Sequence, residues 1–150
     1  MSKHSEFFYN RLKTSGIIKL CIDCCQDEDA ITRKFACFAL GNAAFHNDKL
    51  YPLLKKSIPY VTALLRDEEQ RTRANASGAL GNFARNSDLL IEDIIKANAI
   101  PMLLDIAIDD KCHVSPFFDS LEREKSGSFF FGKLLRFPEL EGNCDKPLVQ

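Results

Sequence analysis

This 150-residue sequence has no excess of charge of either sign and no long apolar run. Its 20 basic residues are balanced by 21 acidic ones, so no overall field draws the protein onto DNA, RNA or an anionic membrane. The longest stretch without Asp, Glu, Lys or Arg, residues 35–47, is too short to cross a bilayer, and the first residues contain no apolar signal core. We therefore expect an intracellular protein of the cytoplasm, with the nucleus left open, that has neither nucleic-acid nor membrane partners.

Residue patterns for catalysis are also missing. The sequence has only three histidines, and none stands in a nucleophile-base arrangement typical of a hydrolase. It contains no glycine-rich phosphate loop, His-Arg-Asp or Asp-Phe-Gly sequence of a kinase. Gly127-Ser-Phe-Phe-Phe-Gly-Lys133 has the spacing of a P-loop, but Leu134 stands where Ser or Thr must reach magnesium. We predict that the chain is not an enzyme and needs no cofactor; a nucleotide-binding enzyme is the remote alternative.

The six cysteines occur without a secretory signal, which favours reduced thiols over disulfides. Four of them fall inside helical patterns and are expected to be small buried hydrophobes: Cys21, Cys24, Cys25 and Cys37. The alternative is a zinc site that would combine the first three with Cys112, His113 and Cys144. Because those three occupy the same positions as Val61, Leu64 and Leu65 after a shift of 40 residues, we predict core packing and no metal.

What the sequence does contain is an internal repeat. Residues 31–50 align with residues 71–90 without a gap, with ten identities in twenty positions that include Leu40/Leu80 and Gly41/Gly81. A period of 40 residues built from helical patterns is typical of stacked helical repeats of the armadillo or HEAT kind, in which one repeat cannot bury its apolar face alone. The sequence therefore predicts an all-α fold, an armadillo-like α-solenoid of two to three three-helix repeats.

Apolar residues at helical spacing place the helices of these repeats. They are expected at residues 5–14, 17–25, 31–45, 49–56, 58–65, 70–85 and 89–98, with another starting at Ile100-Pro101. The repeat units are about 5–45, 48–86 and a partial 88–110, followed by a divergent short helix at 111–125 and a weakly ordered tail at 126–150.

Three local features refine this picture. Asp27-Glu-Asp29 precedes the helix at 31–45 and favours its positive end. That helix is apolar nearly all round, so we expect it to be packed on several sides. Glycine within a helix costs about 1 kcal/mol against alanine, so Gly41 and Gly81, at one repeat position, indicate the close approach of another helix.

Phe38-Ala-Leu-Gly-Asn42 and Gly78-Ala-Leu-Gly-Asn82 resemble the Trp-Ala-Leu-Ser-Asn core of the third helix of armadillo repeats, within a likeness that covers residues 5–110. More narrowly, residues 34–47 and 73–82 look like the armadillo segment at the C-terminal end of Fused-type serine/threonine kinases. The resemblance implies a regulatory or scaffolding part of such a kinase, acting in Hedgehog-type signalling or in cilium assembly.

In armadillo proteins the asparagine of this pentad lines a concave groove and bonds the backbone of an extended peptide. Carried over, Asn42 and Asn82 would form that ladder, since an amide offers two donors and an acceptor. The tryptophan that holds lysine stems in importins is Phe38 in one repeat and Gly78 in the other. The predicted protein-binding residues of the concave face are Phe38, Asn42, His46, Asn75, Asn82 and Arg85.

Two readings of these residues stay open. In the first, they meet a protein or extended peptide, and the chain is an interaction module. In the second, Asn42 and Asn82 only join neighbouring repeats, while His46, Asn75 and Arg85 lie on a solvated face. The chain would then be a structural fragment that packs on further repeats or domains. Open repeat ends also predict self-association.

Overall fold

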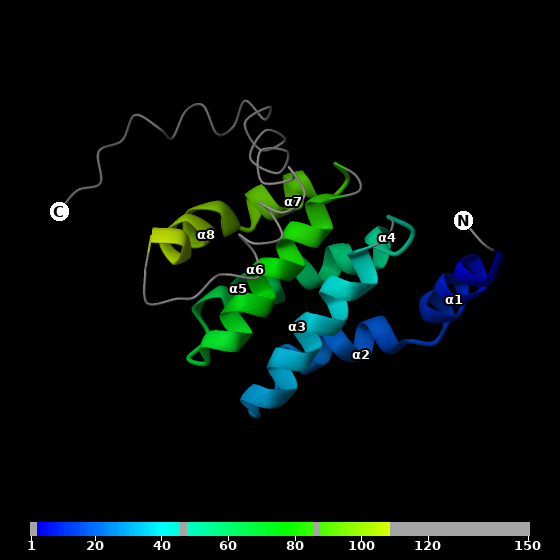
Figure 1. Cartoon of the computed structure of the whole chain (residues 1–150), viewed down its shortest axis with the longest axis horizontal. Helices are drawn as coiled ribbons and strands as arrows, with labels where there is room; N and C mark the ends of the chain where they lie inside the picture. The colour runs from blue at the N-terminus through cyan, green and yellow to red at the C-terminus, as the bar shows by residue number, and fades with distance from the viewer. Residues whose placement is uncertain (1–2, 46–47, 86–87, 109–150) are drawn as a thin grey trace.

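The computed structural model describes residues 3–45, 48–85 and 88–108. Eight α-helices and two short 3-10 helices make up these ranges (Figure 1): α1 (Lys3–Thr14), α2 (Ile17–Cys24), α3 (Ala30–Phe45), α4 (Tyr51–Leu54), η1 (Lys55–Ser57), α5 (Ile58–Ala63), η2 (Leu64–Arg66), α6 (Gln70–Arg85), α7 (Ile91–Lys96) and α8 (Ala99–Ile108). The described residues contain no strand, and the predicted all-α solenoid is confirmed. Within the same ranges, no helix is both long and apolar enough to span a membrane.

Three sequence predictions fall on residues outside the described ranges: the short helix at 111–125, the tail at 126–150 and the binding role of His46. The P-loop-like segment and the three C-terminal members of the suggested zinc site lie there as well. The division into repeat units stays a prediction.

The two long helices form the centre of the molecule. α3 and α6 lie side by side and make the most extensive contact between described elements, with α2 packed on α3 and α5 packed on α6 (Figure 1). Leu40 in α3 and Leu80 in α6 are both completely buried, as expected for equivalent positions of two repeats. Each repeat therefore contributes one long helix to an inner row and supports it with shorter helices.

Glycine determines how closely the inner helices approach. A Cβ atom added to Gly41 would lie 3.0 Å from Ala79 Cα and 3.1 Å from Ala79 Cβ, which is closer than ordinary van der Waals contact. The close helix approach that the sequence predicts at Gly41 is therefore confirmed. By contrast, a Cβ atom added to Gly78 would meet no atom within 4 Å.

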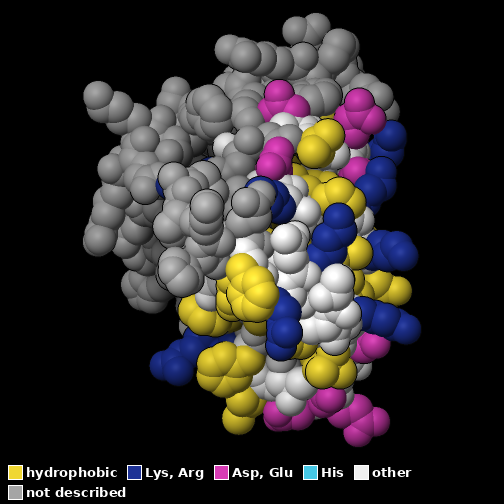
Figure 2. All heavy atoms as spheres, turned by 90° about the vertical axis from the view of Figure 1, so that its right-hand side faces the viewer, with side chains coloured by type: hydrophobic (Ala, Val, Ile, Leu, Met, Phe, Trp, Pro, Cys, Tyr) yellow, Lys and Arg dark blue, Asp and Glu magenta, His cyan; other side chains and the backbone are white. Residues whose placement is uncertain are grey.

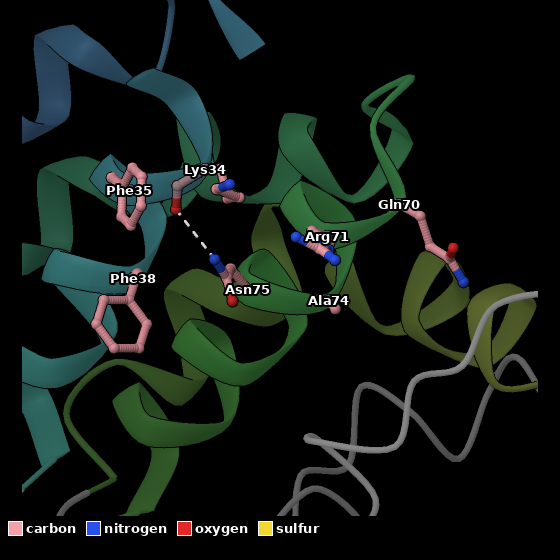
Figure 3. Close-up of a pocket in the computed structure, with 7 residues that line it drawn as sticks. All are labelled: Lys34, Phe35, Phe38, Gln70, Arg71, Ala74 and Asn75. Atoms are coloured by element: carbon pink, nitrogen blue, oxygen red, sulfur yellow. Dashed lines mark hydrogen bonds between the residues drawn. The ribbon is translucent and has the colours of Figure 1, made fainter. Parts of the chain in front are cut away.

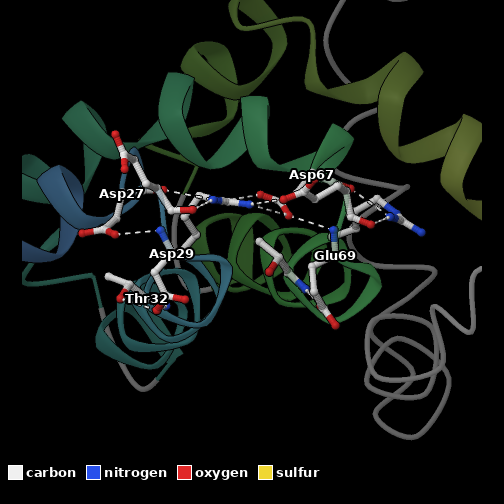
Figure 4. A network of polar contacts seen from close by, with 10 residues as sticks. Asp27, Asp29, Thr32, Asp67 and Glu69 are labelled. Atoms are coloured by element: carbon white, nitrogen blue, oxygen red, sulfur yellow. Dashed lines mark hydrogen bonds and ion pairs between the residues drawn. The ribbon is translucent and has the colours of Figure 1, made fainter.

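The acidic turns before α3 and α6 have the same hydrogen bonds after a shift of 40 residues (Figure 4). Arg33 Nη1 donates to the carbonyls of Asp27 and Glu28 at 3.0 and 2.8 Å, and Arg73 Nη1 donates to those of Asp67 and Glu68 at 2.8 and 3.1 Å. These contacts hold each turn against the first turns of the long helix that follows it.

Carboxylates also satisfy the free N–H groups at the start of both long helices. The Thr32 N–H donates to Asp29 Oδ2 at 2.9 Å, and the Thr72 N–H donates to Glu69 Oε2 at 3.0 Å. A carboxylate that accepts from the first turn also complements the positive end of the helix dipole. The expected role of the acidic turn at the helix start is thus confirmed.

One side of α3 is not covered. Ile31, Phe35 and Phe38 are 59%, 58% and 55% exposed, so the expectation that this helix is packed on several sides is wrong for this side. Their counterparts in α6 are Arg71, Asn75 and Gly78, which are not apolar side chains. Figure 2 shows hydrophobic side chains exposed among lysines and arginines at the end of the molecule where α1 lies. This apolar side therefore belongs to the first repeat alone.

Of the four cysteines in helical patterns, Cys25 and Cys37 are buried and Cys21 and Cys24 are partly buried, and all four are free thiols. A hydrogen bond to Cys25, burial, and the nearby thiol and Asp67 charges raise the pKa of Cys37. Among the described residues, no group of three His, Cys, Asp or Glu side chains could hold a metal ion. Cys25 and Cys37 lie in the hydrophobic core, and Cys21 and Cys24 pack against it.

Candidate peptide-binding groove

Two adjoining hollows lie on the seam between α3 and α6. The larger, of about 490 Å³, is lined by Lys34, Phe35, Phe38, Gln70, Arg71, Ala74 and Asn75 (Figure 3). The smaller, of about 210 Å³, is lined by Cys37, Phe38, Gly41, Asn42, Phe45, Ala74, Asn75, Gly78, Ala79 and Asn82. Because they share Phe38, Ala74 and Asn75, we treat them as one surface, the α3–α6 groove.

The shape of the groove follows from residue size. On α6, Ala74, Gly78 and Ala79 have small side chains or none, so little projects from the helix backbone on that side of the groove. On α3, Phe35 and Phe38 stand on successive turns and form an apolar wall (Figure 3). The repeat sequence has diverged here, because Gly78 occupies the position of Phe38. A shallow trough with one aromatic side is the result.

Two asparagines on α6 connect the inner helices. Asn75 Nδ2 donates to the Lys34 carbonyl and Asn82 Nδ2 donates to the Gly41 carbonyl, each at 3.1 Å. Both bonds span 41 residues, so α3 and α6 run in the same direction with a constant register. The reading in which Asn82 joins neighbouring repeats is therefore correct for one of its donors. Each amide has a second donor and an oxygen that these bonds do not use.

Asn42, the counterpart of Asn82, is in a different position. It is exposed and lines the smaller hollow, and its side chain makes no hydrogen bond with the described residues. Its full amide can therefore accept from and donate to a ligand. That Asn42 binds a ligand stays a prediction.

Four of the six residues predicted from the sequence line the groove: Phe38, Asn42, Asn75 and Asn82. Arg85 lies beside it, with its guanidinium carbon 4.3 Å from the centroid of the Phe45 ring. A cation over an aromatic face is attracted by the ring quadrupole, so this contact fixes Arg85 at one end of the smaller hollow. His46 is outside the described residues.

Sequence reasoning missed several residues of the groove. Phe35 lies in the helix that the sequence predicts to be packed on several sides, yet it forms part of the exposed wall. Lys34 and Arg71 were not selected, yet both line the larger hollow, and Lys34 Nζ lies 4.8 Å from the centroid of the Phe35 ring. The alignment of the two repeats could have identified them, because these charged and aromatic residues near the shared pentad differ between the two repeats.

An ion pair at the foot of the groove joins the repeats. Arg33 Nε donates to Asp67 Oδ2 at 2.6 Å, and Arg33 Nη2 donates to Asp67 Oδ1 at 3.2 Å (Figure 4). Burial by itself would raise the pKa of Asp67, but hydrogen bonds from Arg33 and from the Glu69 N–H, with the nearby positive charges, lower it. Asp67 is therefore ionised and occupied by its partner within the protein.

Taken together, the helices, the inner row and the groove define a protein built of stacked helical repeats. Residues 30–83 match the model of the HEAT-like repeat family. HEAT and armadillo repeats are closely related helical units, and the 40-residue period of this chain agrees with both. Residues 30–83 are thus similar to HEAT-like repeats, and the narrower armadillo resemblance stays a prediction.

The curated relatives are protein kinases. Serine/threonine-protein kinase 36 of Pongo abelii is 34% identical over 96 residues, and that of Mus musculus is 35% identical over 96 residues. Each alignment covers 64% of this chain and 7% of the kinase. Serine/threonine-protein kinase TIO of Arabidopsis thaliana is 49% identical over 57 residues, which are 37% of this chain and 4% of the kinase. The chain is thus similar to a small part of these long proteins.

Proposed function

We propose that this chain is a non-catalytic protein-interaction module that receives an extended peptide or a partner helix in the α3–α6 groove. The observation that carries the proposal is the aromatic wall: Phe35 and Phe38 are more than half exposed beside a hollow of about 490 Å³. Aromatic side chains next to a concavity and flanked by polar groups are typical of protein-binding surfaces. The unused amide of Asn42 adds a group that can hold a peptide backbone.

We further propose that the chain is the regulatory part of a Fused-type kinase, with a role in Hedgehog-type signalling or cilium assembly. The similarity to three proteins named as serine/threonine kinases supports this assignment. The lack of kinase motifs in these 150 residues supports a role in regulation or scaffolding rather than phosphoryl transfer. A cytoplasmic or cilium-associated location is part of the same proposal.

A second candidate is a purely structural role, in which the exposed side of α3 packs on a further repeat or another domain. The observation that favours it is the Asn82 bond to Gly41, because Asn42 holds the equivalent position on α3 and is exposed. In this case Asn42 would donate to a backbone carbonyl of the added helix.

Affinity purification with quantitative mass spectrometry tests the first proposal. The full chain is compared with Phe38→Gln in the groove and with Phe7→Gln on α1, since both phenylalanines are exposed and neither change should alter stability by more than about 0.5 kcal/mol. We expect a set of proteins that the parent chain and Phe7→Gln retain and Phe38→Gln loses. Equal retention by all three chains, with equal melting temperatures, would exclude the groove as the binding surface.

A further inference from the structure

We propose that the ligand of the α3–α6 groove is an acidic peptide segment with an aromatic or aliphatic anchor residue. This inference rests on the proposed interaction function and adds the chemistry of the partner. It is carried by the charges, the exposed aromatic surface and the hydrogen-bonding groups that line the two hollows.

The charged residues that line the groove, within the described ranges, are cationic. Lys34 comes from α3 and Arg71 from α6, and both line the larger hollow (Figure 3). No Asp or Glu is among the described residues that line either hollow. Arg85 lies next to the smaller hollow, where its guanidinium contacts the Phe45 ring. The groove is thus positive, although the whole chain carries a net charge of -1.

Among the described residues, no acidic side chain pairs with the cations of the larger hollow. Neither Lys34 nor Arg71 forms an ion pair with the described residues, and Lys34 Nζ instead lies over the Phe35 ring. In contrast, Arg33 beside Lys34 is fully engaged with Asp67 and with two backbone carbonyls. Within the described part of the chain, the cation that joins the repeats is therefore paired, and those at the groove can pair with an external carboxylate.

The apolar part of the ligand follows from the wall of the groove. Phe35 and Phe38 offer two exposed aromatic faces three residues apart on one helix, directly beside Lys34. An apolar side chain of the ligand can cover these rings while a neighbouring carboxylate reaches Lys34 or Arg71. Covering the rings removes water from the ion pairs and strengthens them. A basic segment would meet like charges at the same place.

A random 12-residue peptide library displayed on phage and selected on the full chain tests this proposal. We expect the selected peptides to be enriched in Asp and Glu and to contain at least one aromatic or large aliphatic residue. Fluorescence anisotropy of two selected peptides then gives affinities for the parent chain and for its variants. Affinity should fall as salt is raised, because exposed ion pairs are screened.

The decisive variant is Lys34→Glu with Arg71→Glu, and its matched control is Lys19→Glu with Lys56→Glu. Both double changes alter the net charge equally, but the control residues are exposed and line neither hollow. Reversing these two charges removes two attractions and adds two repulsions, so we expect an affinity loss of about 10-fold or more for the groove variant. The control should change affinity by less than about 2-fold through its longer-range effect.

The other outcomes would refute the acidic ligand, the groove as a peptide site, or both. Neutral or basic peptides that Phe38→Gln fails to bind would refute the acidic ligand and keep the groove as a peptide site. The absence of any selected peptide, or peptides that bind Phe38→Gln normally, would refute both proposals. A dimer in light scattering that Phe38→Gln dissociates would show that a second copy covers the groove, which also contradicts an acidic ligand.

Discussion

The contact between Gly41 and Ala79 gives the sharpest test of how the repeats pack. We predict that Gly41→Ala is less stable than Gly78→Ala by about 1–3 kcal/mol, the usual cost of overpacking. Both glycines lie inside the long helices, so both changes gain about the same helix propensity, close to 1 kcal/mol. The difference between the two variants therefore isolates the packing cost.

The geometry explains the sign. The new methyl carbon at position 41 would lie 3.0 Å from the Cα atom of Ala79, which belongs to a helix backbone and cannot rotate away. The two inner helices would have to separate, and this would also strain the Asn82 bond to the Gly41 carbonyl. At Gly78 nothing lies within 4 Å, so alanine there should stabilise the protein by up to about 1 kcal/mol.

Urea denaturation followed by circular dichroism measures these free energies of unfolding. A double variant with Gly41→Ala and Ala79→Gly provides a further check, because removing the Ala79 methyl group restores part of the space. Its coupling energy should be favourable, as expected for residues in direct contact. Equal stabilisation by Gly41→Ala and Gly78→Ala would refute the close packing of α3 on α6.

Two further predictions concern the polar contacts between the repeats. Asn82→Ala should lower the free energy of unfolding by about 1 kcal/mol, because the bond to the Gly41 carbonyl is lost. Asn42→Ala should be nearly neutral, because Asn42 is exposed. Equal losses of stability in urea denaturation would contradict this prediction. Arg33→Ala should lower the melting temperature at neutral pH, since Arg33 pairs with Asp67. Because the folded-state pKa of Asp67 is lowered, its stabilising effect is present above the unfolded value of about 3.9 and is lost as pH falls through the folded value. The parent chain should accordingly lose more stability in acid than Arg33→Ala; identical pH profiles would contradict a stabilising pair.

The sequence alone was sufficient for the helices and for the repeat. The apolar spacing and the 40-residue offset predicted both long helices, at 31–45 and 70–85, to within one residue of α3 and α6. The acidic residues before the helix at 31–45 are a helix-start signal in the sequence, and Leu40 and Leu80 align as equivalent positions. The helices and their start signals depend on residues within a few turns of each other, and the repeat is visible by aligning the sequence with itself, so neither requires knowledge of tertiary contacts.

Only the tertiary structure decided which sides of the inner helices are covered. Ile31 and Phe35 look like core residues in a helix that is apolar nearly all round, yet they are exposed because no described helix packs on that side. Lys34 and Arg71 are separated by 37 positions and become neighbours of one hollow only when α3 and α6 stack.

The sequence alone also does not distinguish the two asparagines of the repeats. Asn42 and Asn82 are identical in the sequence alignment, but Asn82 bonds a carbonyl 41 residues away whereas Asn42 is exposed. A repeat pattern gives each residue its place within a unit, and the partner of that residue comes from the adjoining unit. The sequence therefore determined the helices and their periodicity, and the stacking of one helix on another determined which residues form the groove.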